Sequence, residues 1–338
     1  MHPGEFEPAW WLPGPHAQTL GARLLRSRGN VQLRDERIEL SDGDFVDLSW
    51  VQPASGTSSS SSRPLVVVLH GLEGSARSKY ALEMYRALCR EGLDAAGLNF
   101  RSCSGELNRL ARLYHSGDTG DLAAVLEVLR ERFPKRVLGA VGFSLGANVL
   151  LKYLGETDRP LIRAAAAISV PFDLSAGARR LEEGFSRFYR WYLVRRLKRK
   201  ILAKASLLGN RIDLASVRRA RTFPEFDDAA TAPLHGFASA EDYYRRSSCA
   251  RYLAGIRTPT LIIHSGDDPF LPDSAIPRER LRKLRCVEAV ITERGGHVGF
   301  VSGQPWKPVF WAERKAAKFL AGELRVNPLS RSGRNDAY

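Results

Sequence analysis

The sequence predicts an α/β fold with a mostly parallel central sheet and helices on both faces. Two observations carry this prediction. Short apolar segments that favour strands alternate with longer segments of helical spacing over most of the chain. The strand-like segments lie at 64–69, 95–100, 137–141, 164–170, 258–265 and 287–292. Glycine-rich loops follow several of them, as expected where helices join parallel strands.

The length of 338 residues fits one large α/β domain that carries an insertion. The regular alternation stops between residues 175 and 258. We therefore expect a core formed by residues 1–174 and 259–325, with a helical insertion, 175–258, between its two parts. The first segment, 1–30, is expected to pack on this core, and residues 326–338 are expected to form a tail.

Two local patterns precede the first buried strand. Residues 37–40 and 45–51 alternate in polarity around a Ser-Asp-Gly-Asp turn, which predicts a β-hairpin. The serine-rich tract at 55–62 predicts a flexible surface loop. Nothing in that tract indicates a chemical role.

The positive charge of the chain is concentrated in one segment. The formal net charge is +14, and residues 179–221 hold 14 Lys and Arg against three acidic residues, which leaves +11 there. Apolar side chains recur in this segment with helical spacing, at Phe185, Phe188, Tyr189, Tyr192, Leu193, Leu197 and Ile201. Such a helix either covers a site with its apolar face or lies on an anionic membrane. Nucleic-acid binding is not expected, because no recognisable nucleic-acid-binding fold is present.

The four cysteines indicate a reducing compartment. Cys89, Cys103, Cys249 and Cys286 form no C-x-x-C pair, which favours free thiols in a cytoplasmic protein. The first residues do not resemble a signal peptide, and no apolar run approaches ~18 residues. A cytoplasmic location is therefore expected. Peripheral contact with a membrane through the basic segment is the alternative. No metal is expected, because no cluster has metal-ligand spacing.

Residues 142–146 read Gly-Phe-Ser-Leu-Gly and stand between an apolar strand and a segment of helical spacing. In this context a G-x-S-x-G sequence forms a nucleophile elbow, a sharp turn that exposes the serine side chain. The residue at the apex, Ser144, is expected to have a strained backbone, which proteins keep mainly for function. The alternative is a glycine-rich turn with an incidental serine.

A reactive serine needs a base, and the base needs a carboxylate to orient it. The strand at 258–265 ends in a loop that contains Asp267 and Asp268, and His297 follows the next strand. Both loops are expected at the carboxyl edge of the sheet, where α/β proteins place their sites. Asp268 is the favoured acid because it stands four residues before Pro272. Asp267 would then brace the loop, and it remains the alternative acid.

Two backbone amides are candidates for an oxyanion hole, a pair of donors that binds a developing negative charge. One is the amide of Leu145, directly after the serine, and the other is that of Leu72, in the loop after the strand at 64–69. Gly71 allows the backbone to approach a substrate closely. The alternative is an ordinary glycine-rich loop, and His70 is expected to pack rather than react.

Seven motifs occur together: His70–Ser75, Asn99–Glu106, Tyr114–Asp121, Gly142–Asn148, Ser169–Asp173, Asp267–Phe270 and Gly295–Phe300. Together they resemble the YheT-type α/β-hydrolases, bacterial relatives of the eukaryotic ABHD lipases and phospholipases. The resemblance runs from Phe6 to about Leu324. It implies an α/β-hydrolase fold whose insertion is a lid, an esterase or lipase-like activity without a cofactor, and a triad that maps onto Ser144, Asp268 and His297. Ser102 stands where the family more often has glycine, which bears on the shape of that loop.

We therefore expect hydrolysis of carboxylic esters through an acyl-enzyme, with short or medium acyl esters or lipid-like esters as substrates. Acyl transfer to an alcohol other than water stays open, because its first half-reaction is identical. The absence of an H-x₄-D signature disfavours it. A non-catalytic membrane-surface or binding module on the same fold is the other alternative, since a fold alone does not prove a function.

Several polar residues near the motifs are expected to be structural. Asp118 and Asp121 precede a helix, so N-capping and the helix dipole account for them. Arg101 is expected to pair with a carboxylate inside the fold. His115 and His235 are expected to be structural rather than ligands.

Overall fold

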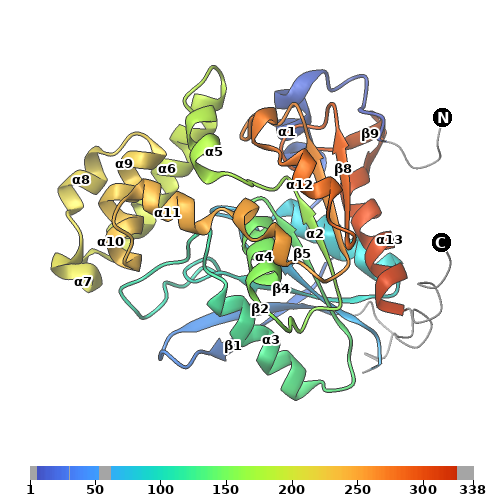
Figure 1. Ribbon diagram of the computed structural model, residues 1–338, viewed down its shortest axis with the longest axis horizontal. Coiled ribbons are helices and arrows are strands. Elements are labelled where there is room, and N and C mark those ends of the chain that lie inside the picture. Colours follow the sequence, from blue (N-terminus) through green and yellow to red (C-terminus); the bar gives the residue numbers. More distant parts are fainter. Residues whose placement is uncertain (1–5, 30, 53–61, 326–338) are drawn as a thin grey trace.

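The computed structural model describes residues 6–29, 31–52 and 62–325 (Figure 1). The tail at 326–338 and the serine-rich tract, apart from its last residue, lie outside the described residues. The predictions made for those two segments therefore stay predictions.

Within the described residues, the chain builds an eight-stranded sheet at its centre. In spatial order its strands are β1 (Leu33–Glu39), β2 (Phe45–Val51), β4 (Asp94–Asn99), β3 (Leu65–Leu69), β5 (Leu138–Phe143), β6 (Ala164–Ile168), β7 (Thr260–Ser265) and β8 (Val287–Thr292). The neighbours from β4 to β8 are parallel, whereas β1 and β2 form an antiparallel hairpin that joins β4. The predicted mostly parallel sheet and the predicted hairpin are confirmed.

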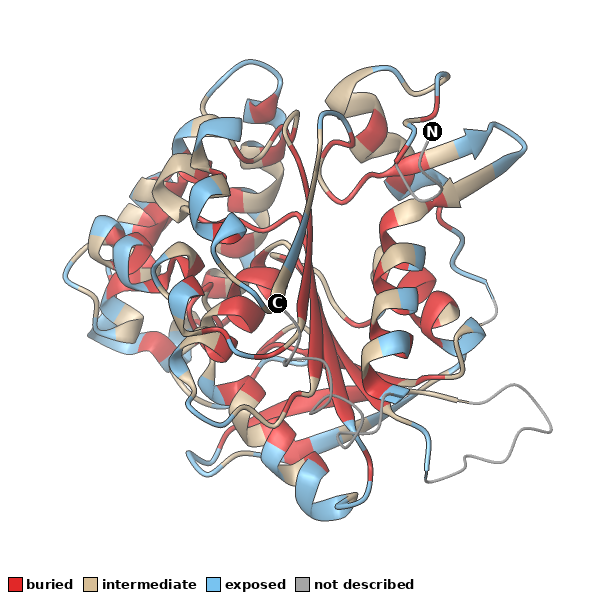
Figure 2. Ribbon diagram, turned by 45° about the vertical axis from the view of Figure 1, so that its right-hand side comes forward, coloured by how far each residue is buried: buried red, intermediate tan, exposed pale blue. Residues whose placement is uncertain are grey.

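Helices cover both faces of the sheet, which Figure 2 shows with its buried strands in the middle of the molecule. The helices α2 (Lys79–Arg90) and α13 (Trp311–Arg325) pack on one face. The helices α3 (Gly120–Arg132), α4 (Leu145–Glu156) and the short α12 (Arg278–Arg282) pack on the other. Alternate side chains of β3 enter the two cores, as the period of a strand requires. Among the described residues, no helix is long and apolar enough to pass through a lipid bilayer.

Between β6 and β7 the chain leaves the sheet and forms a helical insertion (Figure 1). Its helices are α5 (Leu174–Arg180), α6 (Ser186–Ala203), α7 (Ala205–Leu208), α8 (Leu214–Arg219), α9 (Phe223–Phe226), α10 (Ala232–His235) and α11 (Ala240–Ser247). They bury an apolar cluster of their own, which includes Leu197 and Ile201 of α6. Phe185 and Phe188, placed on the same apolar face by the sequence, are instead 51% and 47% exposed. The face is therefore only partly buried.

The N-terminal segment packs beside the last strands of the chain. Helix α1 (Gly14–Leu25) lies against the small hairpin of β9 (Val301–Gln304) and β10 (Lys307–Phe310). The buried side chain of Gln18 accepts a hydrogen bond from the amide of Val301 at 2.8 Å and donates one to its carbonyl at 3.2 Å. These bonds replace the partners that a strand would have supplied.

The start of α3 corrects one expectation. The N-cap position is occupied by Thr119, whose side chain makes no capping bond. Asp121 instead accepts a hydrogen bond from Arg101 at 2.6 Å, and Asp118 accepts one from Arg112 at 2.8 Å. N-capping by the two aspartates was the wrong prediction, because both carboxylates pair with guanidinium groups, the buried one of Arg101 and the partly exposed one of Arg112. Asp121 does lie in the first turn of α3, where the helix dipole favours a carboxylate. The predicted pairing of Arg101 is confirmed.

His264 on β7 makes the stability of the fold dependent on pH. The side chain is fully buried, and neither ring nitrogen has a hydrogen-bond partner among the described residues. Burial lowers the pKa of His264 to about 4, from an ordinary value of 6.5. Between these two values the unfolded chain binds a proton that the folded chain does not, so His264 lowers the stability as the pH falls.

We predict that His264→Leu reduces the loss of stability in acid. At about pH 5 the wild-type histidine should cost about 2 kcal/mol relative to neutral pH, and the leucine variant should not carry this cost. Urea unfolding of both proteins at about pH 7.5 and about pH 5 measures the difference. An equal loss in both proteins would contradict the prediction.

Candidate active site

Ser144 occupies a sharp turn between β5 and α4. Its backbone has φ +52°, a left-handed conformation that is unfavourable for a residue with a side chain. The two flanking glycines make the turn possible. A Cβ atom on Gly142 would lie 2.5 Å from the backbone of α4, and one on Gly146 would lie 2.6 Å from the carbonyl oxygen of Leu69. The elbow geometry expected from the sequence is present.

The structure brings Ser144, Asp268 and His297 together at the carboxyl edge of the sheet. The Nε2 atom of His297 lies 2.9 Å from Oγ of Ser144, and its Nδ1 atom lies 2.7 Å from Oδ2 of Asp268. Asp268 is buried, and its other oxygen accepts a hydrogen bond from the amide of Phe270 at 2.8 Å. The carboxylate is thus held in place, and it can orient the imidazole toward the serine.

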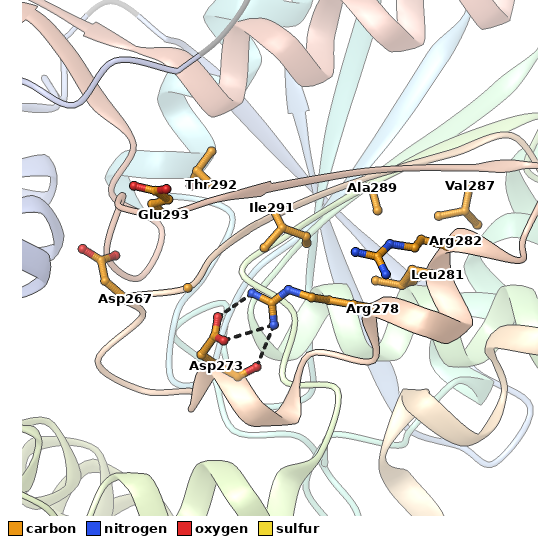
Figure 3. Close-up of a pocket in the computed structure, with 11 residues that line it drawn as sticks. Asp267, Asp273, Arg278, Leu281, Arg282, Val287, Ala289, Ile291, Thr292 and Glu293 are labelled. Carbon is orange, nitrogen blue, oxygen red and sulfur yellow. Dashed lines mark hydrogen bonds and ion pairs between the residues drawn. The ribbon is translucent and has the colours of Figure 1, made fainter.

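Asp267 points elsewhere. Its Oδ1 atom accepts hydrogen bonds from the amide of Gly296, at 2.8 Å, and from the hydroxyl of Ser265. It therefore connects the loop after β7 with the loop that carries His297. Asp267 also lines a separate cavity of ≈ 770 Å³ beside the edge strand β8. Figure 3 shows it at one end of that cavity, apart from the ion pair of Arg278 with Asp273.

Aromatic rings fix the position of the imidazole from one side. The ring of Phe270 stacks on His297 with a centroid distance of 4.1 Å, and Tyr189 of α6 stacks on Phe270 at 4.6 Å. The backbone amide of His297 donates a hydrogen bond to Oγ1 of Thr19 at 2.9 Å, which holds the loop of the histidine. The sequence placed Tyr189 on the apolar face of its helix and Phe270 in a motif, but it predicted no contact of either residue, or of Thr19, with His297.

The amides of Leu72 and Leu145 have no hydrogen-bond acceptor among the described residues. The loop of Leu72 runs close to the serine, because a Cβ atom on Gly71 would lie 3.2 Å from Cβ of Ser144. Neighbouring His70 is fully buried and accepts a hydrogen bond from the amide of Phe100 at 3.2 Å, so it packs as expected. Two amide donors without an acceptor, beside a partly buried serine, are the arrangement that an oxyanion requires.

A cavity of ≈ 1060 Å³ opens above Ser144 and His297. The helical insertion contributes much of its lining, which is mostly apolar, through Leu174, Leu181, Phe185, Phe188, Tyr189, Tyr192, Leu193, Leu197, Phe223 and Phe226. Arg23 and Arg196 also line it, and both donate hydrogen bonds to the hydroxyl of Tyr192. An acyl chain fits the apolar lining, whereas the basic side chains suit polar or anionic groups.

His115 and His235 pack against each other with a centroid distance of 4.6 Å. Burial lowers the pKa of His115 to about 3 and that of His235 to about 2, so both rings are neutral at pH 7. No group of three or more potential metal ligands occurs among the described residues. The ring of His115 also packs edge-on against Phe237 and Tyr243, so the contacts that the structure gives it are packing contacts.

We predict that Gly146→Ala destabilises the protein by ~1–3 kcal/mol, because the added methyl group forces α4 away from β3. The matched control is Gly322→Ala in α13, where a Cβ atom would meet nothing within 4 Å. That change should stabilise the protein by ~0.5–1 kcal/mol. Urea unfolding measures both, and an unchanged stability of Gly146→Ala would show that the elbow is loosely packed.

Comparison with known proteins agrees with this geometry. The family model described as alpha/beta hydrolase fold matches residues 64–304. The chain is 41% identical to YheT of Escherichia coli (strain K12), over 95% of this chain and 94% of that protein. It is 31% identical to phospholipase ABHD3 of Mus musculus (88% of this chain, 74% of that protein) and 33% identical to a monoacylglycerol lipase of Saccharomyces cerevisiae (73% and 58%). With its sheet, its elbow and these relatives, the chain belongs to the α/β hydrolase family.

Proposed function

We propose that the protein is a serine hydrolase that cleaves carboxylic esters through an acyl-enzyme, with Ser144 as nucleophile, His297 as general base and Asp268 as the orienting acid. One observation carries the proposal: a continuous hydrogen-bonded path of 2.9 Å and 2.7 Å runs from Ser144 through the imidazole to a buried carboxylate. A neutral serine hydroxyl is a weak nucleophile, and an adjacent base is what activates it.

The class of reaction has support from the relatives. Phospholipases and monoacylglycerol lipases act on lipid esters, and this chain belongs to their family. The protein is accordingly a carboxylic ester hydrolase. The roles of individual residues and the covalent intermediate are our proposal.

In the first half-reaction, Oγ of Ser144 attacks the ester carbonyl carbon while Nε2 of His297 takes the hydroxyl proton. Asp268 stabilises the imidazolium that forms, and the amides of Leu72 and Leu145 bind the negative oxygen. When the tetrahedral intermediate collapses, the C–O bond breaks and the imidazolium gives its proton to the departing alcohol. The serine is then acylated.

In the second half-reaction, His297 activates a water molecule that attacks the acyl-enzyme and releases the carboxylic acid. An alcohol in place of water would give acyl transfer. Water is the acceptor that we propose, because the relatives are named as lipases and phospholipases. The apolar cavity over Ser144 favours an acyl chain, so we propose short or medium acyl esters or lipid-like esters as substrates.

We further propose that the insertion is a lid whose outer surface contacts an anionic membrane. Phe185, Phe188 and Trp191 are 47–51% exposed and lie near the basic side chains of α6. Arg195 lies over the ring of Trp191 at 5.5 Å. Exposed aromatic rings among cations are typical of helices that insert at the headgroup level of a bilayer.

We predict that the wild type hydrolyses p-nitrophenyl esters between C2 and C16 and that Ser144→Ala abolishes this activity. The chain-length optimum reports the usable depth of the cavity. A fluorophosphonate probe should label Ser144 in the wild type, because only an activated serine reacts. Folded wild-type protein that neither hydrolyses any ester nor takes up the probe would support the non-catalytic binding module instead.

The two neighbouring aspartates give a sharper test of the triad. Asp268→Asn should lower kcat by ~10⁴-fold, because an amide favours the wrong tautomer of the imidazole. Asp267→Asn should cause a much smaller loss, since its carboxylate braces the loop and does not touch the ring. The ratio of the two kcat values decides the assignment. A larger loss for Asp267→Asn would make Asp267 the triad acid.

The membrane proposal predicts that the protein sediments with vesicles of phosphatidylcholine and phosphatidylglycerol but not with pure phosphatidylcholine. Added salt should release it. Trp191→Ser should weaken sedimentation. The matched control, Trp306→Ser, removes a tryptophan that is 80% exposed on the β9–β10 hairpin and should change nothing. Equal weakening by both variants would contradict a specific contact through α6.

A further inference from the structure

We propose that Lys200 of α6 is a positioning residue for the oxyanion hole. Its ammonium group holds the side chain of Glu73, and Glu73 holds the loop that presents the amide of Leu72 to the substrate. The inference rests on the proposed ester hydrolysis and adds a residue from the insertion to its machinery.

The loop around Leu72 is fixed on both sides by tyrosine hydroxyl groups. The amide of Gly71 donates a hydrogen bond to Oη of Tyr80 at 2.9 Å, and the amide of Glu73 donates one to Oη of Tyr114 at 2.8 Å. The amide between them, that of Leu72, is left without an acceptor among the described residues. The two anchors thus determine where this free N–H group points.

The anchor on the Glu73 side depends on Lys200. The Tyr114 hydroxyl that accepts from the Glu73 amide also donates to Oε1 of Glu73 at 3.0 Å. Nζ of Lys200 donates to the same Oε1 atom at 2.6 Å. The side chains of Glu73 and Lys200 are only 3% and 11% exposed. Because this carboxylate is buried, removing its closest cation leaves its charge with only the more distant Arg196, and we expect the loop to rearrange.

The backbone of Glu73 shows that the loop is held against its own preference. It has φ +54°, a conformation that glycine adopts easily and glutamate rarely does. Such a conformation persists only where the surroundings determine it strongly. The bonds to Tyr114 and Lys200 are those that restrain Glu73 here, with Arg196 as a more distant cation at 3.6 Å from Oε2.

Lys200 also links two parts of the structure that are 127 residues apart in the chain. Its Nζ atom lies 3.2 Å from Sγ of Cys103, in the loop after β4, and 5.1 Å from the centre of the Tyr114 ring. The oxyanion loop therefore contacts the insertion through this ammonium group, beside the ion pair of Glu73 with Arg196 and the packing of Leu72 on the apolar cluster of the insertion. Of these contacts, the one with Lys200 is the shortest polar contact, and its loss would loosen the loop that presents the Leu72 amide.

Steady-state kinetics on p-nitrophenyl butyrate tests the proposal. Lys200→Met should lower kcat by ~10-fold or more and leave KM within ~2-fold, because the hole acts on the transition state and not on the bound ester. Glu73→Gln should give a similar loss. The double variant should lose no more kcat than the more impaired of the two single variants, since both changes remove the same interaction. Lys200→Arg should recover part of kcat.

The matched control is Lys315→Met, which removes a partly exposed ion pair between α13 and Glu288 of β8 and should leave kcat unchanged. The rate at which a fluorophosphonate labels Ser144 gives a second readout, because the phosphonyl oxygen enters the same hole. Folded Lys200→Met with a kcat and a labelling rate within ~2-fold of the wild type would overturn the proposal.

If Lys200→Met does not fold, Lys200→Arg and Glu73→Gln carry the test, and wild-type values of kcat and labelling rate in Glu73→Gln overturn it. A wild type without Ser144-dependent turnover would refute the proposed ester hydrolysis. In that case the labelling rates of wild type and variants still decide the role of Lys200.

Discussion

The site depends on the pairing of β3 with β5. The two strands are parallel and in register, with Leu69 opposite Gly142, so the loop after β3 and the turn after β5 leave the sheet side by side. The first carries Leu72 and the second carries Ser144. Gly146 lets α4 start directly against the end of β3, because a Cβ atom at this position would lie only 2.6 Å from the carbonyl oxygen of Leu69. The pairing of the two strands therefore brings the proposed nucleophile and the two proposed amide donors side by side.

Strained backbone conformations are concentrated in the loops at the carboxyl edge of the sheet. Among the described residues, the non-glycine positions with positive φ are Glu73, Ser102, Ser144, Ser169, Val298 and Phe300. Ser102 has φ +61°, which gives a physical reason for the glycine that the family more often has there. Its hydroxyl group donates to Asn108 at 2.6 Å and accepts from the same residue's amide at 3.0 Å. The serine therefore keeps the shape of the loop by hydrogen bonding.

The sequence predicted the parts of the site that are local in the chain. The elbow and the loops of Asp268 and His297 follow strands directly, so spacing alone indicated their place at one edge. Contacts between distant segments gave no such signal. Lys200 was one of 14 basic residues counted in one segment, yet its side chain is only 11% exposed and meets Glu73. Charge counts describe a segment as a whole, and they cannot single out the cations that are removed from solvent, such as Lys200 and the buried Lys204.

The hydrogen bond between Thr19 and the amide of His297 affects when the site can form during protein synthesis. It joins residues that are 278 positions apart, and it holds the backbone of the loop that carries His297. During synthesis on a ribosome, the serine and its elbow emerge long before the histidine loop can meet α1. A nascent chain therefore carries the proposed nucleophile before the proposed base is fixed. The hydrolysis that we propose can begin only after the loop of His297 has packed against α1.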